Sequence, residues 1–297
     1  MLTPTEWQEA GDFIRLGKHR IFYIDNKPTN PGLAALPVII LIHGFPTSSW
    51  DWHKIWDSLG ERYHLIALDM LGFGFSDKPN PYTYSINEQA DIVEALVDAL
   101  SLSNFHILAH DYGDTVTQEI IARHNSDNGR GKLLSVCFLN GGLFPETHKA
   151  LPIQKLLLSP FGKIINALTT KRRFDISMSR VFGPKTKPSA AELSHFWGLI
   201  NQNKGRHIFH NLITYMTDRI THRERWVDGL RSATMPISLI NGSYDPVSGA
   251  HMIAHYKNII GEPIFLKEFK HIGHYPQVEA PQDIVLAYLA FLDDILT

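Results

Sequence analysis

The sequence predicts an α/β fold: a mostly parallel, doubly wound sheet with an inserted helical cap. Short apolar runs alternate with segments of helical periodicity over residues 38–139 and again over residues 237–296, as in successive βαβ units. Residues 143–232 contain no clear strand and are divided by five prolines, which predicts a block of separate helices. Such insertions usually lie over the carboxyl ends of the strands, where ligands bind. We therefore expect a core of residues 1–142 and 233–297, and a helical cap of residues 143–232.

The individual elements follow from periodicity and capping. Alternating apolar residues on either side of Gly17 and Lys18 predict an N-terminal hairpin. Ser85 is expected to cap a helix that runs to Leu100, because apolar residues recur there at helical spacing. Another helix is expected from Tyr112. Two more helices are expected, one from about residue 247 and one over residues 281–296. Continuous apolar runs predict the remaining strands, at residues 38–42, 64–68, 105–109, 133–139, 237–240 and 264–269.

Composition narrows the class of protein. The 297 residues are 44% hydrophobic with a net charge of −2 and a pI of about 6.8, so the chain can bury a full core and has no general attraction to nucleic acid. No apolar run reaches membrane-spanning length, and the N-terminus does not resemble a signal peptide. We expect a cytoplasmic protein with no membrane span, either a monomer or a homodimer. Cys137, the one cysteine, lies in an apolar run and is expected to be buried.

Sixteen histidines raise the question of a metal site. His251 and His255 are four residues apart, and His207 and His210 are three apart. Neither pair has a nearby acidic residue in the spacing that a zinc site uses. We therefore interpret these histidines as helix-surface residues and expect neither a metal nor another cofactor.

Two basic runs fall in the expected cap, at residues 171–173 and residues 219–225. Such runs usually form solvated faces, and this is the favoured interpretation. Binding of a partner or of a membrane surface is the alternative.

The first candidate catalytic residue is Asp111, in the sequence AHDYG between an expected strand and an expected helix. The small residues two positions before and after Asp111 let the strand and the helix approach closely. The sharp turn between them lifts one side chain above the sheet. This is the pattern of a nucleophile elbow, with aspartate as the nucleophile. For the aspartate taken alone, a simple helix N-cap is the alternative.

Two further residues follow later strands. Asp245 lies in the loop after the strand expected at residues 237–240, and His274 lies in the loop after the next strand. Together with Asp111 they give the order nucleophile, acid, histidine, which is the order found in α/β-hydrolases. A loop aspartate or histidine is usually just solvated, but three in this order at strand ends predict a catalytic triad.

Long blocks of the sequence carry a resemblance to a known family. The chain resembles α/β-hydrolases of the aspartate-nucleophile branch, which includes epoxide hydrolases, haloalkane dehalogenases and fluoroacetate dehalogenases. It is also similar to the mesoderm-specific transcript proteins. The blocks that carry the likeness are HGFPTSSWDW, ALDMLGFGFSDKP, YSINEQADIVEAL, HDYGD, NGGLFPETH, VFGPKTKPSAAEL and HYPQVEAP.

The chemistry of this branch has two steps. In this chain we expect the carboxylate of Asp111 to attack a saturated carbon and become an alkyl ester. We expect His274 to activate a water that attacks the ester carbonyl, and Asp245 to orient the imidazole and stabilise its charge. The resemblance further implies that the backbone N–H groups of Phe45 and Tyr112 bind the oxyanion.

Residues near the triad bear on the leaving group. Haloalkane dehalogenases hold the halide with a tryptophan next to the nucleophile and with an asparagine or second tryptophan; here Tyr112 and Phe45 stand at these positions. Trp197 in the cap could be a partner, although a packing role is favoured. Fluoroacetate dehalogenases hold a carboxylate with arginines just after the nucleophile. Asp114 and Thr115 stand there instead, which argues against an anionic substrate.

Epoxide hydrolases share the HGxP motif, which begins here at His43, and use two cap tyrosines to protonate the epoxide oxygen. The expected cap contains one tyrosine, Tyr215. We therefore expect a substrate pocket that includes His43, Trp197 and Tyr215, and an epoxide hydrolase-like reaction on an apolar small molecule. Haloalkane dehalogenase-like hydrolysis and a ligand-binding protein on a hydrolase scaffold are the alternatives.

Overall fold

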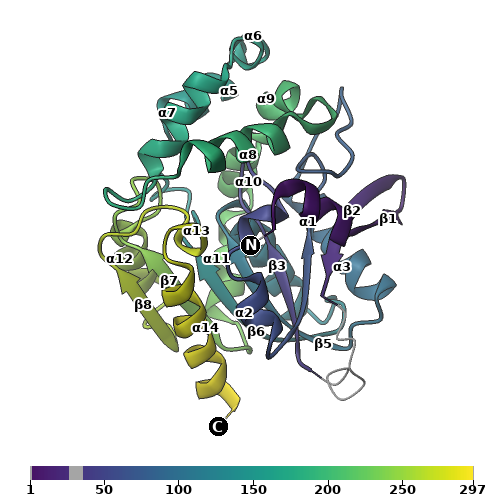
Figure 1. Ribbon diagram of the computed structural model, residues 1–297. Helices are drawn as coiled ribbons and strands as arrows, with labels where there is room; N and C mark the ends of the chain where they lie inside the picture. Colours follow the sequence, from purple (N-terminus) through teal and green to yellow (C-terminus); the bar gives the residue numbers. More distant parts are fainter. Residues whose placement is uncertain (1, 27–35, 297) are drawn as a thin grey trace.

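The computed structural model describes residues 2–26 and 36–296, and its centre is an eight-stranded sheet with the order β1-β2-β4-β3-β5-β6-β7-β8 (Figure 1). Strands β3 to β8 pair in parallel, whereas β2 is antiparallel to both β1 and β4. The prediction of a mostly parallel, doubly wound sheet is therefore confirmed. The strands are β1 Asp12–Leu16, β2 His19–Asp25, β3 Val38–Ile42, β4 His64–Leu68, β5 Asn104–His110, β6 Lys132–Leu139, β7 Ile237–Gly242 and β8 Phe265–Phe269.

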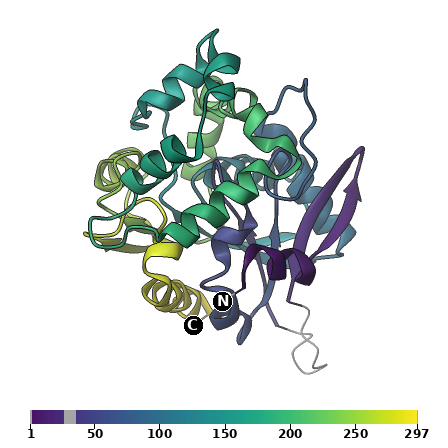
Figure 2. The same cartoon turned by 45° about the horizontal axis from the view of Figure 1, so that its top comes forward.

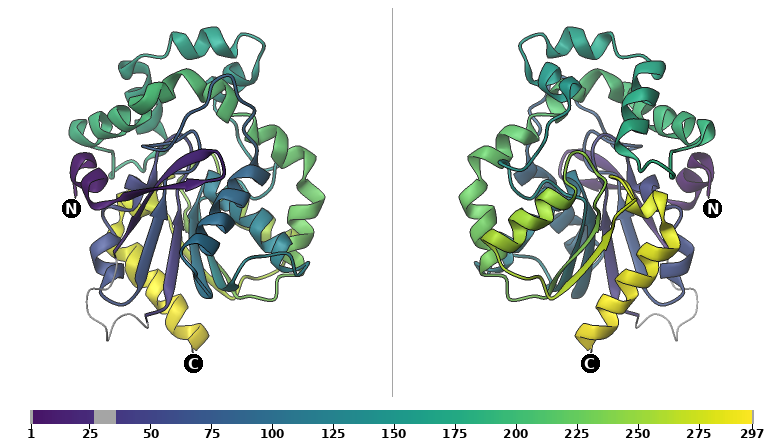
Figure 3. Two further views of the ribbon diagram at one scale, coloured as in Figure 1. Left: turned by 90° about the vertical axis from the view of Figure 1, so that its right-hand side faces the viewer. Right: turned by 90° about the vertical axis from the view of Figure 1, so that its left-hand side faces the viewer.

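Helices cover both faces of this sheet. Helices α2 and α14 lie on one face, and α3, α4 and α12 lie on the other (Figure 3). Helix α3 begins as predicted, because the Ser85 hydroxyl accepts a hydrogen bond from the N–H of Glu88 at 3.2 Å. The helices of the core layers are α1 Pro4–Ala10, α2 Trp56–Gly60, α3 Ile86–Ala99, α4 Tyr112–His124, α12 Ala250–Ile259, α13 Pro276–Glu279 and α14 Pro281–Leu296, with a 3₁₀ turn at Ser49–Trp52.

The central strands are buried on both sides, which explains their unbroken apolar sequences. Ile39, Ile40 and Leu41 of β3 have no exposed surface, and Cys137 of β6 is buried as predicted. The hairpin between β1 and β2 turns at Gly17, whose φ of +57° is a left-handed conformation that favours glycine.

Six helices lie above the carboxyl ends of the strands, where they cover that edge of the sheet (Figures 1 and 2). They are α5 Pro152–Leu158, α6 Gly162–Ala167, α7 Lys171–Val181, α8 Ala190–Asn201, α9 Phe209–Leu212 and α10 Tyr215–Thr221, with a 3₁₀ segment at Gln202–Ile208. The next helix, α11 Arg223–Arg231, packs against α4 in the layer beside the sheet. Within the described part of the chain, no helix has both the length and the apolar character needed to cross a membrane.

Candidate active site

Asp111 stands at a sharp turn between β5 and α4. Its φ of +48° and ψ of −102° are rare for a residue with a side chain, and conformations of this kind cost about 1–3 kcal/mol that the surrounding fold must supply. Gly113 makes the turn sterically possible, because a Cβ there would lie 2.3 Å from the carbonyl oxygen of Ile42. The strained turn places the carboxylate beyond the end of the sheet, which is what the elbow pattern predicts.

The loop after β3 supplies a hydrogen-bond donor to this carboxylate. The N–H of Phe45 donates to Oδ2 of Asp111 at 3.0 Å. Gly44 allows this approach, since a Cβ at that position would lie 2.7 Å from Nδ1 of His110 and 2.9 Å from Cβ of Asp111. Tyr112 is the first residue of α4, so its N–H has no partner within the helix. These are the two N–H groups expected at an oxyanion hole.

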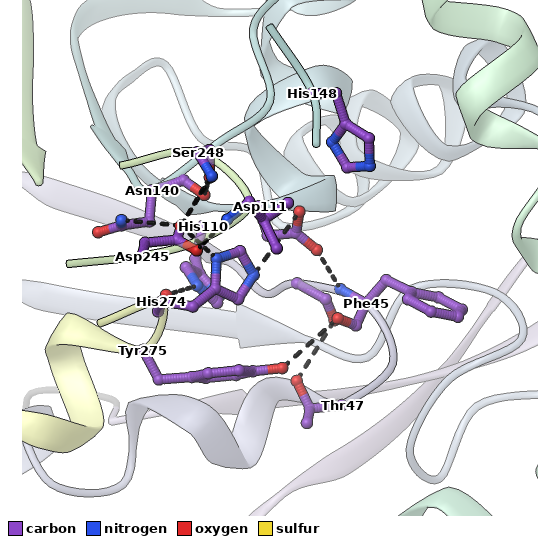
Figure 4. Close-up of polar contacts among 12 residues, drawn as sticks. Phe45, Thr47, His110, Asp111, Asn140, His148, Asp245, Ser248, His274 and Tyr275 are labelled. Carbon is purple, nitrogen blue, oxygen red and sulfur yellow. Dashed lines mark hydrogen bonds and ion pairs between the residues drawn. The ribbon is translucent and has the colours of Figure 1, made fainter. Parts of the chain in front are cut away.

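His274 and Asp245 meet beside Asp111, from the loops after β8 and β7 (Figure 4). Nδ1 of His274 lies 2.7 Å from Oδ2 of Asp245, and its Nε2 lies 3.9 Å from Oδ1 of Asp111. Burial alone would lower the pKa of the imidazole, but the Asp245 carboxylate, its hydrogen bond and the Asp111 charge together raise that pKa to about 9. The resting imidazole is therefore a cation that faces two carboxylates at neutral pH.

Asp245 stays ionised because its neighbours compensate for its burial. Burial raises the pKa of this carboxyl, but the charge and hydrogen bond of His274 and the donors of the turn outweigh it, so the pKa is lowered. The N–H of Val247 donates at 2.8 Å, the hydroxyl of Ser248 at 2.8 Å and the side-chain amide of Asn140 at 3.1 Å. Asn140 follows β6 and was not predicted as a site residue. The signal available in the sequence was an asparagine followed by two glycines at the end of a strand, where the site residues lie.

His110 also escaped the sequence analysis. Its Nε2 lies 2.7 Å from the carbonyl oxygen of His274, so this nitrogen carries the proton and donates. Burial, followed by the charge of His274, lowers the pKa of His110 to about 3, so the ring is neutral. The neutral ring ties the elbow to the loop that carries His274.

A cavity of about 460 Å³ opens onto these residues. Asp111, His274 and Phe45 lie in its wall, so the structure brings these predicted residues to one space. Most of the remaining wall is apolar and comes from the inserted helices, including Leu151, Ile153, Leu157, Ile165, Phe174 and Met178. A cavity of this size and lining suits a small apolar ligand.

Three residues expected in the pocket do not line this cavity. His43 is buried beneath the loop, where Nε2 accepts from the N–H of Met70 at 3.1 Å, and burial lowers its pKa. Trp197 is half-buried and packs on Phe174 with ring centroids 5.5 Å apart, which is the packing role weighed for it. Tyr215 is buried behind the wall, and its hydroxyl accepts from the side-chain amide of Gln154 at 3.4 Å.

The matching family is described as the alpha/beta hydrolase fold, and the match covers residues 37–281. The chain belongs to this family. It is 42% identical to the human mesoderm-specific transcript homolog protein, with 97% of this chain and 87% of that protein covered, and 33% identical to LipZ of Mycobacterium tuberculosis, with 99% and 100% covered. The solved structure of a loop variant of a haloalkane dehalogenase from Bradyrhizobium elkanii superposes on this chain with a TM-score of 0.79 at 18% sequence identity, and the match covers 96% of each of the two chains. This likeness shows that the two proteins share a fold. The resemblance inferred from sequence blocks is thus confirmed.

In this α/β-hydrolase, one arginine contradicts the expectation that residues 219–225 form a solvated face. Arg219 on α10 is only 2% exposed. Its guanidinium donates to the backbone carbonyl of Asp111 at 3.3 Å and to the hydroxyl of Thr115 at 2.8 Å, and it lies 3.9 Å from Oδ1 of Asp111. A buried cation is tolerated when hydrogen bonds and an anion surround it. Arg219 therefore helps to hold the elbow and its negative charge.

Asp114, which stands where fluoroacetate dehalogenases have an arginine, does not reach the cavity. The Asp114 side chain is fully buried, is absent from the cavity wall and lies against Gly141, where a Cβ would come within 1.9 Å of its carboxyl oxygen. Burial, and then the charge of Asp111, raises the pKa of Asp114 well above its usual value, which favours the neutral form of this carboxyl. The Asp114 carboxyl is therefore not a charge that meets the substrate, and the expectation against an anionic substrate rests on the absence of arginines at residues 114 and 115.

The hydrolase also has a cavity tyrosine that was not predicted, because the resemblance to epoxide hydrolases pointed to tyrosines of the cap. Tyr275 follows His274 directly and lines the cavity. Its hydroxyl donates to the carbonyl oxygen of Phe45 at 3.4 Å (Figure 4). Burial raises the pKa of this phenol well above its ordinary value, so it remains a protonated donor. Its position next to the candidate histidine was the available signal.

Proposed function

We propose that this protein is a cofactor-independent hydrolase in which Asp111 forms a covalent alkyl ester, and that its preferred substrate is an epoxide of an apolar small molecule. The arrangement around Asp111 carries the proposal. One carboxylate oxygen accepts from the N–H of Phe45 at 3.0 Å, the other lies 3.9 Å from Nε2 of His274, and both belong to a residue in the wall of an apolar cavity. Membership of a hydrolase family supports the reaction class.

In the first step, a carboxylate oxygen of Asp111 attacks a ring carbon of the epoxide. The bond between that carbon and the ring oxygen breaks, and the electron pair stays on the oxygen, which then takes a proton. We assign this proton to the hydroxyl of Tyr275, which lines the cavity directly after His274 in the chain, and the resulting tyrosinate regains its proton from solvent. Arg219, which holds the backbone carbonyl of Asp111, keeps the attacking side chain in place.

The second step depends on a change in the charge around His274. Ester formation removes the negative charge of Asp111, which is one of the causes that raise the pKa of His274, so the imidazolium loses its proton more easily and releases it to solvent. The neutral imidazole takes a proton from a water as that water attacks the ester carbonyl, and Asp245 stabilises the imidazolium. The N–H of Phe45 is placed to bind the oxyanion on Asp111. The tetrahedral intermediate collapses as the bond between the carboxyl carbon and the substrate oxygen breaks. That oxygen takes the proton of the new carboxyl group, so the diol leaves and the carboxylate of Asp111 is restored.

Isotope labelling tests this mechanism in the unaltered protein. In a single turnover in ¹⁸O-water with enzyme in excess, we expect the label in Asp111 and not in the diol, because the new oxygen enters the ester carbonyl carbon of the enzyme. Mass spectrometry of the peptide that carries Asp111, together with that of the product, provides the readout. Label in the diol at the first turnover would mean that water attacks the substrate directly and would refute the covalent mechanism.

The substrate class is tested with a panel of epoxides and bromoalkanes of similar size. We expect kcat/KM for styrene-oxide-like epoxides to exceed that for 1-bromoalkanes by about tenfold or more, which corresponds to about 1.4 kcal/mol in the barrier. The reason is that the described cavity wall offers the hydroxyl of Tyr275 and contains no tryptophan to bind a departing halide. Equal or faster bromide release would instead favour the haloalkane dehalogenase-like alternative.

A further inference from the structure

Large apolar side chains are exposed on helices α5 to α7, at the end of the molecule farthest from α14 (Figure 1). Of ten such side chains among the described residues, six fall in residues 151–181, including Phe161 at 66%, Ile164 at 59% and Leu168 at 56% exposure. The N–H of Ile164 bonds to the carbonyl of Phe161, and the N–H of Leu168 bonds to that of Ile164. These three residues therefore form a stripe along one short helix, and clustered exposure of this kind marks an interaction site.

The same segment is strongly basic, although the chain as a whole carries a net charge of −2. Residues 151–187 contain eight lysines and arginines and one acidic residue, Asp175, which pairs with Lys171 at 2.7 Å. In the described part of the chain, Lys155, Lys163 and Arg172 have no ion-pair partner. Apolar side chains surrounded by unpaired basic ones are typical of a surface that lies on an anionic membrane.

The cavity opens within this surface. Leu156 and Leu168 are 48% and 56% exposed, and both also line the cavity that reaches Asp111. Arg173 is likewise exposed and lines the cavity. An apolar compound dissolved in a bilayer would therefore meet the cavity without crossing water.

We propose that the surface formed by α5, α6 and the start of α7 docks on a lipid bilayer that contains anionic headgroups. Phe161, Ile164 and Leu168 enter the boundary between headgroups and acyl chains, and the surrounding lysines and arginines contact lipid phosphates. A second copy of the chain fits less well, because a symmetric contact would bring two basic surfaces together. This inference does not depend on the chemistry at Asp111, so it stands or falls separately from the proposed function.

Vesicle flotation tests the docking. We expect the full chain to float with vesicles of phosphatidylcholine and phosphatidylserine at least tenfold better than with phosphatidylcholine alone, and less well as salt screens the charges. Ile164→Ser and the pair Lys163→Ser with Arg172→Ser should each reduce binding several-fold. Ile264→Ser is the matched control, because Ile264 is 68% exposed but lies directly before β8 on the core, and this variant should bind as the unaltered chain does. No binding, or an equal loss in the control, overturns the proposal.

A fluorescent label identifies the occupant of the surface. Cys137 is fully buried, so Phe161→Cys introduces the accessible thiol to which an environment-sensitive dye can be attached, with Ile264→Cys as the control site. Anionic vesicles should shift the emission of the dye at residue 161 to the blue and leave the dye at residue 264 unchanged. A shift that grows with protein concentration without vesicles, together with a doubled mass in sedimentation, would assign the surface to a second copy and overturn the membrane proposal.

Discussion

Replacing His274 with glutamine is expected to trap the alkyl ester on Asp111. The carboxylate needs no base to attack, so the first step should proceed, whereas the water that hydrolyses the ester loses the imidazole that activates it. Intact-mass analysis after incubation with a reactive epoxide should show one added substrate mass. Digestion should locate this mass on the peptide that carries Asp111.

Two variants serve as controls for the trapping experiment. Asp111→Ala should give no adduct and no turnover, because the attacking oxygens are gone. Asp245→Asn should also accumulate the ester, but more slowly than His274→Gln does. The imidazole remains in this variant but loses the carboxylate 2.7 Å away that orients it. Circular dichroism must be native-like for each variant, because all three residues are buried. An adduct on another residue, or turnover by Asp111→Ala, would exclude Asp111 as the nucleophile.

Replacing Tyr275 with phenylalanine is expected to lower the rate of ester formation from epoxides by roughly 10²–10⁴, the range for a positioned proton donor. The ring stacks on Phe182 at 5.2 Å, and phenylalanine keeps this contact, so the fold should be retained. Stopped-flow measurement of ester formation in the His274→Gln background isolates the step. A bromoalkane is the matched control substrate, because a departing bromide needs no proton and its release should change little.

Tyr215→Phe separates the two tyrosines that could supply this proton. Tyr215 is not among the residues that line the cavity, and its hydroxyl accepts from the side-chain amide of Gln154, which does line it, so we expect a smaller loss than in Tyr275→Phe. If Tyr215→Phe proves the more damaging of the two, the proton donor is the cap tyrosine that the resemblance implied. Unchanged rates in both variants would remove the main support for an epoxide over a halide.

Local patterns in the sequence were sufficient to predict the sheet, because each pattern has a physical cause within a few residues. Continuous apolar runs predicted β3, β5 and β6, since strands covered by helices on both faces must be apolar throughout. The small residues around Asp111 predicted the elbow, since only such residues permit the approach between Gly113 and the carbonyl of Ile42. The order of the strands along the chain then placed Asp111, Asp245 and His274 at one edge of the sheet.

The tertiary structure alone decided which side chains face the cavity and which lie behind it. Arg219 belongs to a basic run that is indistinguishable in sequence from a solvated face, yet it is buried against the elbow, whereas Trp197 and His43 turn into packing contacts. The direction of a side chain on an inserted helix depends on how that helix packs over the sheet. This packing is set by contacts between residues far apart in the chain, such as Arg219 and Thr115, which are 104 positions apart. Spacing along the chain does not record such contacts, so the pocket could not be read from it.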